Sequence, residues 1–433
     1  MQKSIWSQKT DLPSFPSLDL TKKTDVLIVG GGICGILCAH LLKQAGVDCV
    51  VAEKGRIFHG TSCGTTAKIT SQHGIIYTRL ANNYGKEFAE KYFCANEDAI
   101  KMYEKLCQSI DCDFEKKQSF VYSTDDMEKI EKEAKILSSI GADVSVSYKL
   151  PLPLSIAGAV GIKNQAQFDP FKFAAHISKG LNIYENTIVK HLTQKGAVCE
   201  KGEIEAKKII VATHFPFINS HGAYFLKMYQ HRSYVLALEN APELKGMYVD
   251  EKDDGLSFRN SQKHLLLGGF GARTGKNCGG WRELEKFAKE HYPKSRITHR
   301  WATQDCMSLD KIPYVGQYSK NTPNLYVATG FNKWGMTSSM VSASILCDLV
   351  QEKENEYAHI FSPSRSIAKP QLFVNGFETI CNFLKPTVKR CSHLGCSLKW
   401  NKQEHTWDCS CHGSRFEKDG TLINNPATKD TKI

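Results

Sequence analysis

The sequence contains no long hydrophobic run. None of its 433 residues belongs to a stretch that approaches the roughly 18 uninterrupted apolar residues of a membrane-spanning helix. Residues 1–20 have neither the apolar segment of a secretory signal nor a twin-arginine motif. An internal repeat and a low-complexity tract are also absent. These features predict a cytoplasmic protein without a membrane span.

Charge of one sign is not concentrated anywhere in the chain. The net charge of +11 arises from 56 Lys and Arg residues that are interleaved with 45 Asp and Glu residues. Because no basic tail or arm stands out, we expect no nucleic-acid partner. The length allows two or three domains of roughly 100–200 residues each.

Cysteine is present, but not in the density of a disulfide framework. Sixteen cysteines are spread over 433 residues without an export signal. We expect most of them to be reduced residues of the core, as for Cys34, Cys38, Cys107, Cys112 and Cys347. Only the C-terminal cysteines have a spacing that asks for another explanation.

A glycine-rich turn follows a predicted strand over residues 24–30. Gly30, Gly32 and Gly35 form the pattern G-x-G-x-x-G at the start of a predicted helix, and Glu53 ends the next predicted strand. The first glycine permits the tight turn, the second lets backbone amides approach a pyrophosphate, and the third allows close packing of helix on sheet. The helix N-terminus attracts phosphate, and Glu53 can accept hydrogen bonds from a ribose. The pattern predicts a dinucleotide site, the alternative being a glycine turn without ligand.

Two later segments favour FAD over NAD as this dinucleotide. Residues 207–216 read as a late strand and turn that return to the cofactor, and residues 328–337 read as a second glycine loop. A helix that begins near Thr337 would direct its N-terminus at a flavin ring and stabilise the anionic reduced form. Short strands over about 143–300 indicate an antiparallel, substrate-facing layer.

The C-terminal region carries a cysteine and histidine pattern. Cys391 and His393 form Cys-x-His, and 15 residues later Cys409 and His412 form Cys-x-x-His. Two thiolates and two imidazoles from two loops can bind one iron through sulfur and the other through nitrogen, as in a Rieske [2Fe–2S] centre. A structural zinc site is the alternative, although zinc sites usually pair their cysteines as C-x-x-C.

Several motifs together resemble a known family. They are VLIVGGGICG with Glu53, GTSCGTTAKIT at 60–70, QFDPFKFA at 167–174 and SLDKIPYVG at 308–316. Over roughly residues 20–360 the chain resembles the D-amino-acid oxidase or glycine oxidase superfamily of FAD-dependent oxidoreductases. As a whole it is similar to bacterial members that carry a C-terminal Rieske domain.

The resemblance implies an α/β fold, with a Rossmann-type FAD-binding domain interleaved with an antiparallel-sheet substrate domain and followed by a small all-β Rieske segment. The implied boundaries are 24–75, 185–216 and 300–350 for FAD binding, 77–184 and 217–300 for the substrate layer, 361–385 for a linker, and 386–433 for the Rieske domain.

The resemblance also implies the site residues. The cofactor-binding residues are Gly30, Gly32, Gly35, Glu53, Lys54, Thr65, Thr66, Ala67, Thr213, Gly330, Gly335 and Met336. Cys391 and Cys409 would bind one iron of the cluster, and His393 and His412 the other. Cys396 and Cys411 match a disulfide that bridges the two cluster loops in relatives, and Ser414 matches a hydroxyl that bonds a cluster sulfur.

The C-terminal segment is shorter than a usual Rieske domain, because little chain remains for the β base that carries the cluster loops. We therefore expect the loops to pack directly on the flavin domain, through residues 371–384 (QLFVNGFETICNFL) and through Trp400 and Trp407.

The two cofactors together imply an enzyme that dehydrogenates a small amine or amino acid and passes electrons singly to an external acceptor. Arg232 and Tyr234 are the candidates for binding a substrate carboxylate, unless they are ordinary strand residues. His73, Lys333 and Trp334 are candidates for the flavin face. An electron-transfer reductase module without an amine substrate is the alternative. A Rieske oxygenase is disfavoured, because no convincing set of two histidines and a carboxylate for a second iron is found.

Overall fold

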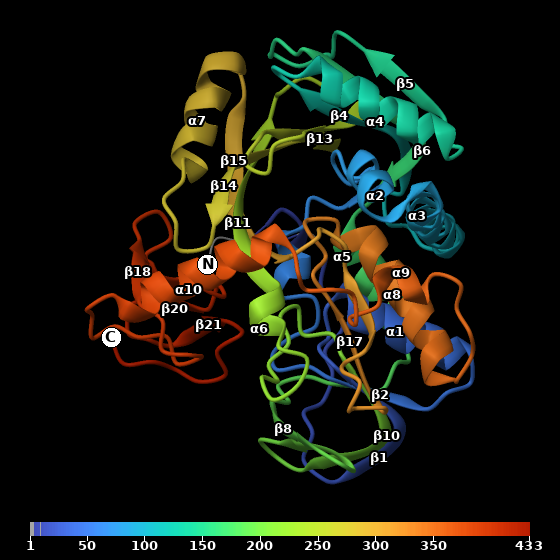
Figure 1. Ribbon diagram of the computed structural model, residues 1–433, viewed down its shortest axis with the longest axis vertical. Helices are drawn as coiled ribbons and strands as arrows, with labels where there is room; N and C mark the ends of the chain where they lie inside the picture. Colours follow the sequence, from blue (N-terminus) through green and yellow to red (C-terminus); the bar gives the residue numbers. More distant parts are fainter. Residues whose placement is uncertain (1–3, 9) are drawn as a thin grey trace.

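The computed structural model describes residues 4–8 and 10–433 and arranges them around two large sheets and one small sheet. The first large sheet occupies the lower half of Figure 1, the second the upper half, and the small C-terminal sheet lies to the left (Figure 1).

The first sheet carries the glycine-rich turn. Its order is β16-β17-β10-β1-β2-β7, with β9 and β8 attached to β10. The strands are β1 (Lys22–Val29), β2 (Cys49–Ala52), β7 (Ile183–Tyr184), β8 (Val189–Thr193), β9 (Gly196–Cys199), β10 (Glu203–Val211), β16 (Tyr314–Gln317) and β17 (Leu325–Thr329). The pairs β1–β2, β1–β10, β10–β17 and β2–β7 are parallel. Because a central parallel sheet is covered on both faces, its strands are runs of buried aliphatic residues such as Val26–Val29.

The second sheet is mainly antiparallel, in the order β15-β11-β14-β13-β12-β4-β6-β3 with β5 attached to β6. The strands are β3 (Lys68–Ile69), β4 (Glu115–Ser123), β5 (Val144–Ser147), β6 (Gly158–Gln167), β11 (Met228–Glu239), β12 (Gly246–Asp250), β13 (Ser257–Ser261), β14 (His264–Arg273) and β15 (Arg296–Ser308). The one parallel pair recorded in it joins β12 to β4.

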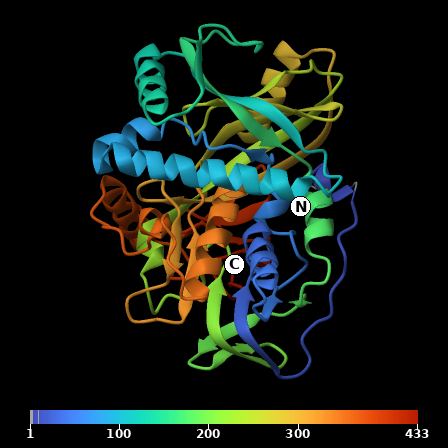
Figure 2. The same ribbon diagram turned by 90° about the vertical axis from the view of Figure 1, so that its right-hand side faces the viewer.

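The helices cover these sheets and fill the space between them. They are α1 (Ile33–Gln44), α2 (Tyr77–Tyr84), α3 (Lys86–Cys107), α4 (Met127–Ser139), α5 (Pro170–Ile177), α6 (Tyr224–Lys227), α7 (Gly280–His291), α8 (Gly335–Val350) and α9 (Ala358–Phe361), with short 3-10 helices η1 (Trp6–Gln8) and η2 (Thr61–Gly64). Figure 2 shows α3 crossing the waist of the molecule between the two sheets. Helices α1, α3 and α8 bury their apolar residues in one continuous core with α2, α4 and α5.

The C-terminal region consists of α10 (Pro370–Leu384) and a four-stranded sheet, β18 (Leu398–Asn401), β19 (Thr406–Cys409), β20 (Arg415–Phe416) and β21 (Leu422–Asn424). Successive strands pair antiparallel, as in a meander. Residues 386–433 are called the C-terminal domain below.

The predicted α/β fold class is confirmed, and two details differ from the boundaries expected from sequence. Strand β15 runs through residue 300 and pairs with β11, so residues 300–308 belong to the second sheet. Most of the predicted linker 361–385 is the helix α10. Within the described residues, no helix is long and apolar enough to cross a membrane.

Substituting Gly35 tests the close packing of α1 on the first sheet. A Cβ atom at this position would overlap the carbonyl oxygen of Gly30, which is backbone and has little room to move. We expect Gly35→Ala to lower the free energy of unfolding by about 2 kcal/mol or more. Denaturant unfolding followed by far-UV circular dichroism measures this loss.

Gly376→Ala is the matched control, because Gly376 also lies in a helix but has no atom near the added methyl group. This variant should be neutral or more stable by up to about 1 kcal/mol. Equal stability of the two variants would contradict the packing argument.

Candidate functional site

The glycine-rich turn places the N-terminus of α1 at the central cavity. Gly30 has φ +111, and a Cβ atom there would lie 2.6 Å from the carbonyl oxygen of Ala212. Gly32 is the N-cap of α1 and offers no side chain to its amides. The amide of Ile33 is bound by the hydroxyl of Ser62, at 3.0 Å. Since Gly30 and Gly32 both line the central cavity, the positive end of the helix dipole is directed at any phosphate bound there.

Glu53 is fixed beside this turn. Its carboxylate accepts hydrogen bonds from the amide of Gly31, at 2.7 Å, and from the amide of Gly55, at 2.9 Å. It also lines the cavity, which is where a carboxylate must lie to bind the ribose of a dinucleotide.

A single cavity of about 1930 Å³ joins the two large sheets and the C-terminal domain. Nine of the twelve predicted cofactor-binding residues line it: Gly30, Gly32, Glu53, Lys54, Thr65, Thr66, Thr213, Gly335 and Met336. The other three lie behind its wall. Gly35 packs against Gly30, the carbonyl of Ala67 accepts a hydrogen bond from Arg259 at 2.9 Å, and Gly330 has φ +73 in the turn before α8.

Aromatic rings form one flat part of the cavity wall. The ring of His73 stacks on that of Trp334, with centroids 5.0 Å apart and planes 14° from parallel. The imidazole is held by Tyr92 at 2.7 Å and by Thr337 at 3.0 Å. Burial lowers the pKa of His73 to about 3, so the ring is neutral. His73, Trp334 and Lys333 were predicted near the flavin face, and all three line the cavity.

Two cavity-lining charges were missed from sequence. Burial, and then the charge of Arg259, lower the pKa of Lys68 to about 7. Its ammonium donates a hydrogen bond to the hydroxyl of Thr66, at 3.1 Å. Burial raises the pKa of Asp305 to about 6. Lys68 lies within the segment 60–70 that carries the family resemblance, but the sequence does not tell that its half-buried side chain lines the cavity.

The two predicted cluster loops face one another in the C-terminal domain. Each closes on itself: the amide of Cys391 donates to the carbonyl of Cys396 at 2.8 Å, and that of Cys409 to the carbonyl of Ser414 at 2.9 Å. Each also turns through a glycine with positive φ, namely Gly395 and Gly413.

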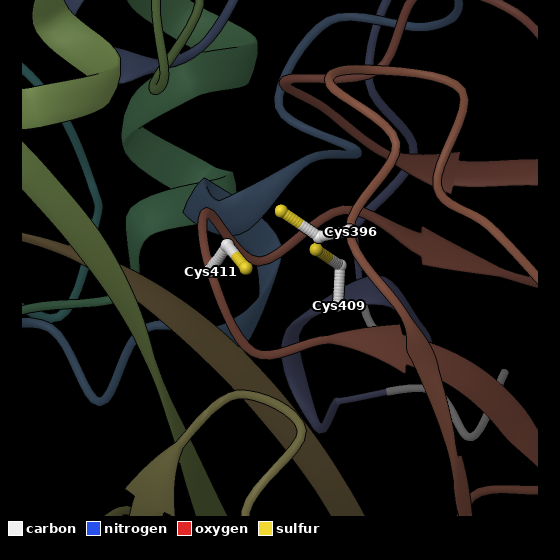
Figure 3. A group of neighbouring side chains, drawn as sticks. All are labelled: Cys396, Cys409 and Cys411. Carbon is white, nitrogen blue, oxygen red and sulfur yellow. The ribbon is translucent and has the colours of Figure 1, made fainter. Parts of the chain in front are cut away.

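Four sulfur atoms converge between these loops. Hydrogen bonds from Cys391, Cys396 and Cys411 hold the pKa of the Cys409 thiol well below its usual value. The sulfurs of Cys396, Cys409 and Cys411 lie within 4.8 Å of one another (Figure 3). Because iron is bound by the thiolate form, this setting suits Cys409 to be a ligand.

The two predicted histidine ligands lie beside the sulfurs. The rings of His393 and His412 are 5.0 Å apart. The Nδ1 atom of each is buried and has no hydrogen-bond partner within the described residues. Burial lowers the pKa of both, that of His393 to about 4, which leaves the neutral imidazole that a metal needs. Two orphaned buried nitrogens next to converging thiols fit a [2Fe–2S] cluster.

The predicted disulfide remains a prediction. Cys396 and Cys411 are free thiols in this structure, although their sulfurs are neighbours.

Side chains of strands β11, β14 and β15 in the second sheet hold the cluster loop 409–414 through its carbonyls. Arg273 donates to the carbonyls of Ser410 and Cys411, both at 2.8 Å. Gln230 donates to the carbonyl of His412 at 2.9 Å, and Gln304 to that of Gly413 at 2.8 Å. Direct packing of the loops on the flavin domain was predicted. The residues that make these contacts were not, because they are distant in sequence.

Arg232 and Tyr234 also belong to this interface. The guanidinium of Arg232 forms an ion pair with Glu404, which accepts a further hydrogen bond from Tyr234 at 3.3 Å. Arg415 approaches the same carboxylate, at 2.9 Å, and also pairs with Asp408 at 3.0 Å. The substrate role predicted for Arg232 and Tyr234 remains untested, and their observed partner instead places them at a contact between domains.

The segments predicted to pack the C-terminal domain on the flavin domain differ in the contacts that they make. Trp400 and Trp407 pack on each other, at 5.0 Å, and the ammonium of Lys389 lies over Trp407. Residues 371–384 were expected to make the contact with the flavin domain. Most apolar residues of α10 point outward, and Asn375 and Asn382 are the buried residues of this helix. Its polar groups, rather than its apolar ones, make the contact.

Comparison with known proteins identifies both parts of the chain. Residues 25–349 match the family model of FAD dependent oxidoreductases (DAO), and residues 382–433 match that of the Rieske [2Fe-2S] domain. The chain therefore belongs to the DAO family of FAD-dependent oxidoreductases and carries a Rieske domain. Its cofactors are FAD and a [2Fe–2S] cluster. The match to the Rieske domain decides against the structural zinc site that was the alternative from sequence.

Individual relatives agree with this assignment. YhfW of Bacillus subtilis (strain 168), provisionally named a Rieske 2Fe-2S iron-sulfur protein, is 35% identical over an alignment that covers 99% of this chain and 97% of the relative. Among solved structures, L-proline dehydrogenase from P. horikoshii superposes with a TM-score of 0.68 at 18% identity and covers 80% of this chain and 98% of its own. Glycine oxidase from Geobacillus kaustophilus gives 0.67 at 20% identity, covering 80% of this chain and 100% of its own. The two structures share the fold.

Glu404 gives the domain interface a dependence on pH. Burial alone would raise its pKa, but the charges of Arg232 and Arg415 outweigh burial and lower the pKa to about 2. A folded-state pKa below the unfolded value of about 4.3 stabilises the protein above that pH, and the contribution is lost as the pH falls toward 2. We expect Glu404→Gln to cost about 3 kcal/mol at pH 7 and less as the pH approaches 2.

Thermal unfolding of wild type and variant between pH 7 and pH 3 measures this difference. Glu417→Gln, at a neighbouring exposed carboxylate of the same domain, is the control and should be neutral. A Glu404→Gln protein as stable as wild type at pH 7 would show that the ion network contributes nothing.

Proposed function

We propose that this protein dehydrogenates a small amine or amino acid and passes the electrons, one at a time, through the Rieske domain to an external acceptor. The observation that carries the proposal is the shared cavity. Its walls include the glycine turn and Trp334 of the flavin domain, and also Glu404, Arg415 and Asn425 of the Rieske domain. When bound, FAD supplies two-electron hydride chemistry and the cluster supplies one-electron transfer.

A chain of hydrogen bonds leads from the cavity wall to the cluster loop. Thr213 lines the cavity, and its carbonyl accepts a hydrogen bond from the amide group of Asn425 at 2.8 Å. The carbonyl of Asn425 accepts from Gln230 at 2.9 Å, and Gln230 also donates to the carbonyl of His412. This connection supports electron transfer between the two centres within one chain.

The cavity offers positive charge to an anionic substrate. Burial lowers the pKa of Lys68 most, and the charge of a second cation, Arg259, lowers it further. No carboxylate contributes to this pKa. The guanidinium of Arg79, which also lines the cavity, has a buried Nε without a partner among the described residues. A carboxylate would neutralise such groups. The names of the glycine oxidase and the L-proline dehydrogenase that share the fold also favour an amino acid.

Anaerobic titration of the purified protein with a panel of amines and amino acids tests the reaction. We expect at least one member to bleach the flavin absorbance and, with cytochrome c as acceptor, to support its reduction. His412→Ala should lose the iron, keep flavin bleaching, and reduce cytochrome c at least about tenfold more slowly.

Cys381→Ser is the control for this experiment, because Cys381 is exposed and lies outside the cluster loops. It should retain iron and both activities. Bleaching of the flavin by a nicotinamide but by no amine would contradict the proposal and favour an electron-transfer reductase. Unchanged cytochrome c reduction by iron-free His412→Ala would remove the cluster from the route.

Lys68 allows the substrate class to be tested separately. We expect Lys68→Met to raise the KM for a carboxylate-bearing substrate by about tenfold or more, since a buried charge-assisted hydrogen bond is lost. The KM for an amine without a carboxylate should stay unchanged. Lys132→Met, at an exposed lysine of α4, is the matched control. An equal effect on both substrates would rule out Lys68 as the carboxylate site.

A further inference from the structure

Helix α10 presents an apolar stripe to the outside of the molecule. Phe373, Phe377, Ile380 and Leu384 are 77%, 67%, 59% and 73% exposed. Their spacing of three and four residues places them on one face of the helix. Val374 and Phe383 widen this stripe and are also exposed. These six residues are called the α10 stripe, and the helix crosses the front of the C-terminal region in Figure 1.

Helix α10 has its polar face inward and its apolar face outward, which is the reverse of a helix packed on the core of a soluble protein. Its polar residues make the contacts with the rest of the protein: Asn375 accepts a hydrogen bond from Arg273 at 2.8 Å, and Glu378 pairs with Lys276 at 2.5 Å. The backbone carbonyl of Asn382 accepts a hydrogen bond from the backbone amide of Ser397, at 2.9 Å. Because these bonds fix the helix by its polar face, the stripe cannot turn inward without breaking them.

The ends of α10 are positively charged. Lys369 precedes the helix, and Lys385, Lys389 and Arg390 follow it, whereas Glu378 is the one acid within it and faces inward. The stripe is therefore framed by cations and lacks an outward carboxylate of its own. The pKa of Lys399 is lowered by burial and then by the charges of Lys276 and Lys385, which agrees with a gathering of cations at this end.

The α10 stripe adjoins the cluster. The ring of Phe383 lies close to Gly395 of the cluster loop. A Cβ atom added at Gly395 would be 3.6 Å from that ring. Arg390 donates to the carbonyl of Phe383 at 2.7 Å and to that of Gly395 at 3.1 Å. Exposed Leu394, next to the ligand His393, continues the apolar surface.

We propose that the α10 stripe binds the surface of an anionic lipid bilayer. A helix of 15 residues, about 22 Å long, with an aromatic and aliphatic face outward and cations at its ends, has the chemistry of an interfacial helix. Its outward apolar side chains can insert among lipids, and the flanking lysines match anionic headgroups. The attachment is peripheral and places the cluster loop beside the membrane.

Attachment itself does not depend on the amine substrate. The consequence that electrons leave toward a membrane-bound or lipid-dissolved acceptor rests on the proposed function. Vesicles that contain no electron carrier therefore test the attachment alone.

Co-sedimentation of the holoprotein with vesicles is the experiment. Vesicles of phosphatidylcholine with about one third phosphatidylglycerol should bind wild type more strongly than phosphatidylcholine alone. The double variant Phe377→Ser with Ile380→Ser should lower the partition coefficient by about tenfold or more. Lys385→Glu should weaken binding to the anionic vesicles only. Tyr148→Ser, at an aromatic that is 69% exposed far from α10 in sequence, is the control and should bind like wild type.

Flavin absorbance and iron content check that each variant is intact, and Lys385→Glu provides the test if the double variant does not fold. Wild type that stays in the supernatant with both vesicle types, or a double variant that binds like wild type, overturns the proposal. A wild-type dimer that Phe377→Ser converts to a monomer in analytical ultracentrifugation, without vesicle binding, would assign the stripe to a second copy instead.

Discussion

Glu404 lies between two guanidinium groups that belong to different domains, Arg232 and Arg415, and the arrangement of the whole chain depends on this contact. A buried charge is tolerated only when opposite charge and hydrogen bonds surround it, so removing one partner leaves the others uncompensated. The Rieske domain is a meander of short strands with one small core cluster. Such a small unit has little apolar area to stabilise it alone, so docking supplies part of its stability.

The cavity is a product of the same docking. The first sheet provides the glycine turn and the N-terminus of α1, the second provides Lys68 and Asp305, and the Rieske domain provides a further part of the wall. A cavity with walls from three sheets exposes its lining to less bulk water than a flat surface of one sheet would. Charges such as that of Lys68 are therefore felt more strongly by a bound ligand than they would be at a surface.

The features predicted correctly from sequence are those set by neighbours along the chain. The turn at Gly30, Gly32 and Gly35 follows from local backbone geometry, and the cluster pattern from residues a few positions apart. The ion-pair partner of Arg232 could not be predicted from the sequence, because Glu404 lies 172 residues away. The direction of α10 could not be predicted for a related reason: periodicity separates its two faces, and only the distant residues Arg273 and Lys276 decide which face turns inward.

The carbonyl contacts made by Arg273, Gln230 and Gln304 have a kinetic consequence. In an assembly whose iron–sulfur head swings on a tether, the frequency of productive encounters limits turnover, and friction with the solvent slows it. Here the Rieske domain is fixed to the second sheet by several hydrogen bonds to the carbonyls of the cluster loop 409–414. The gap between the redox centres is then constant, and internal electron flow should be indifferent to added glycerol or sucrose.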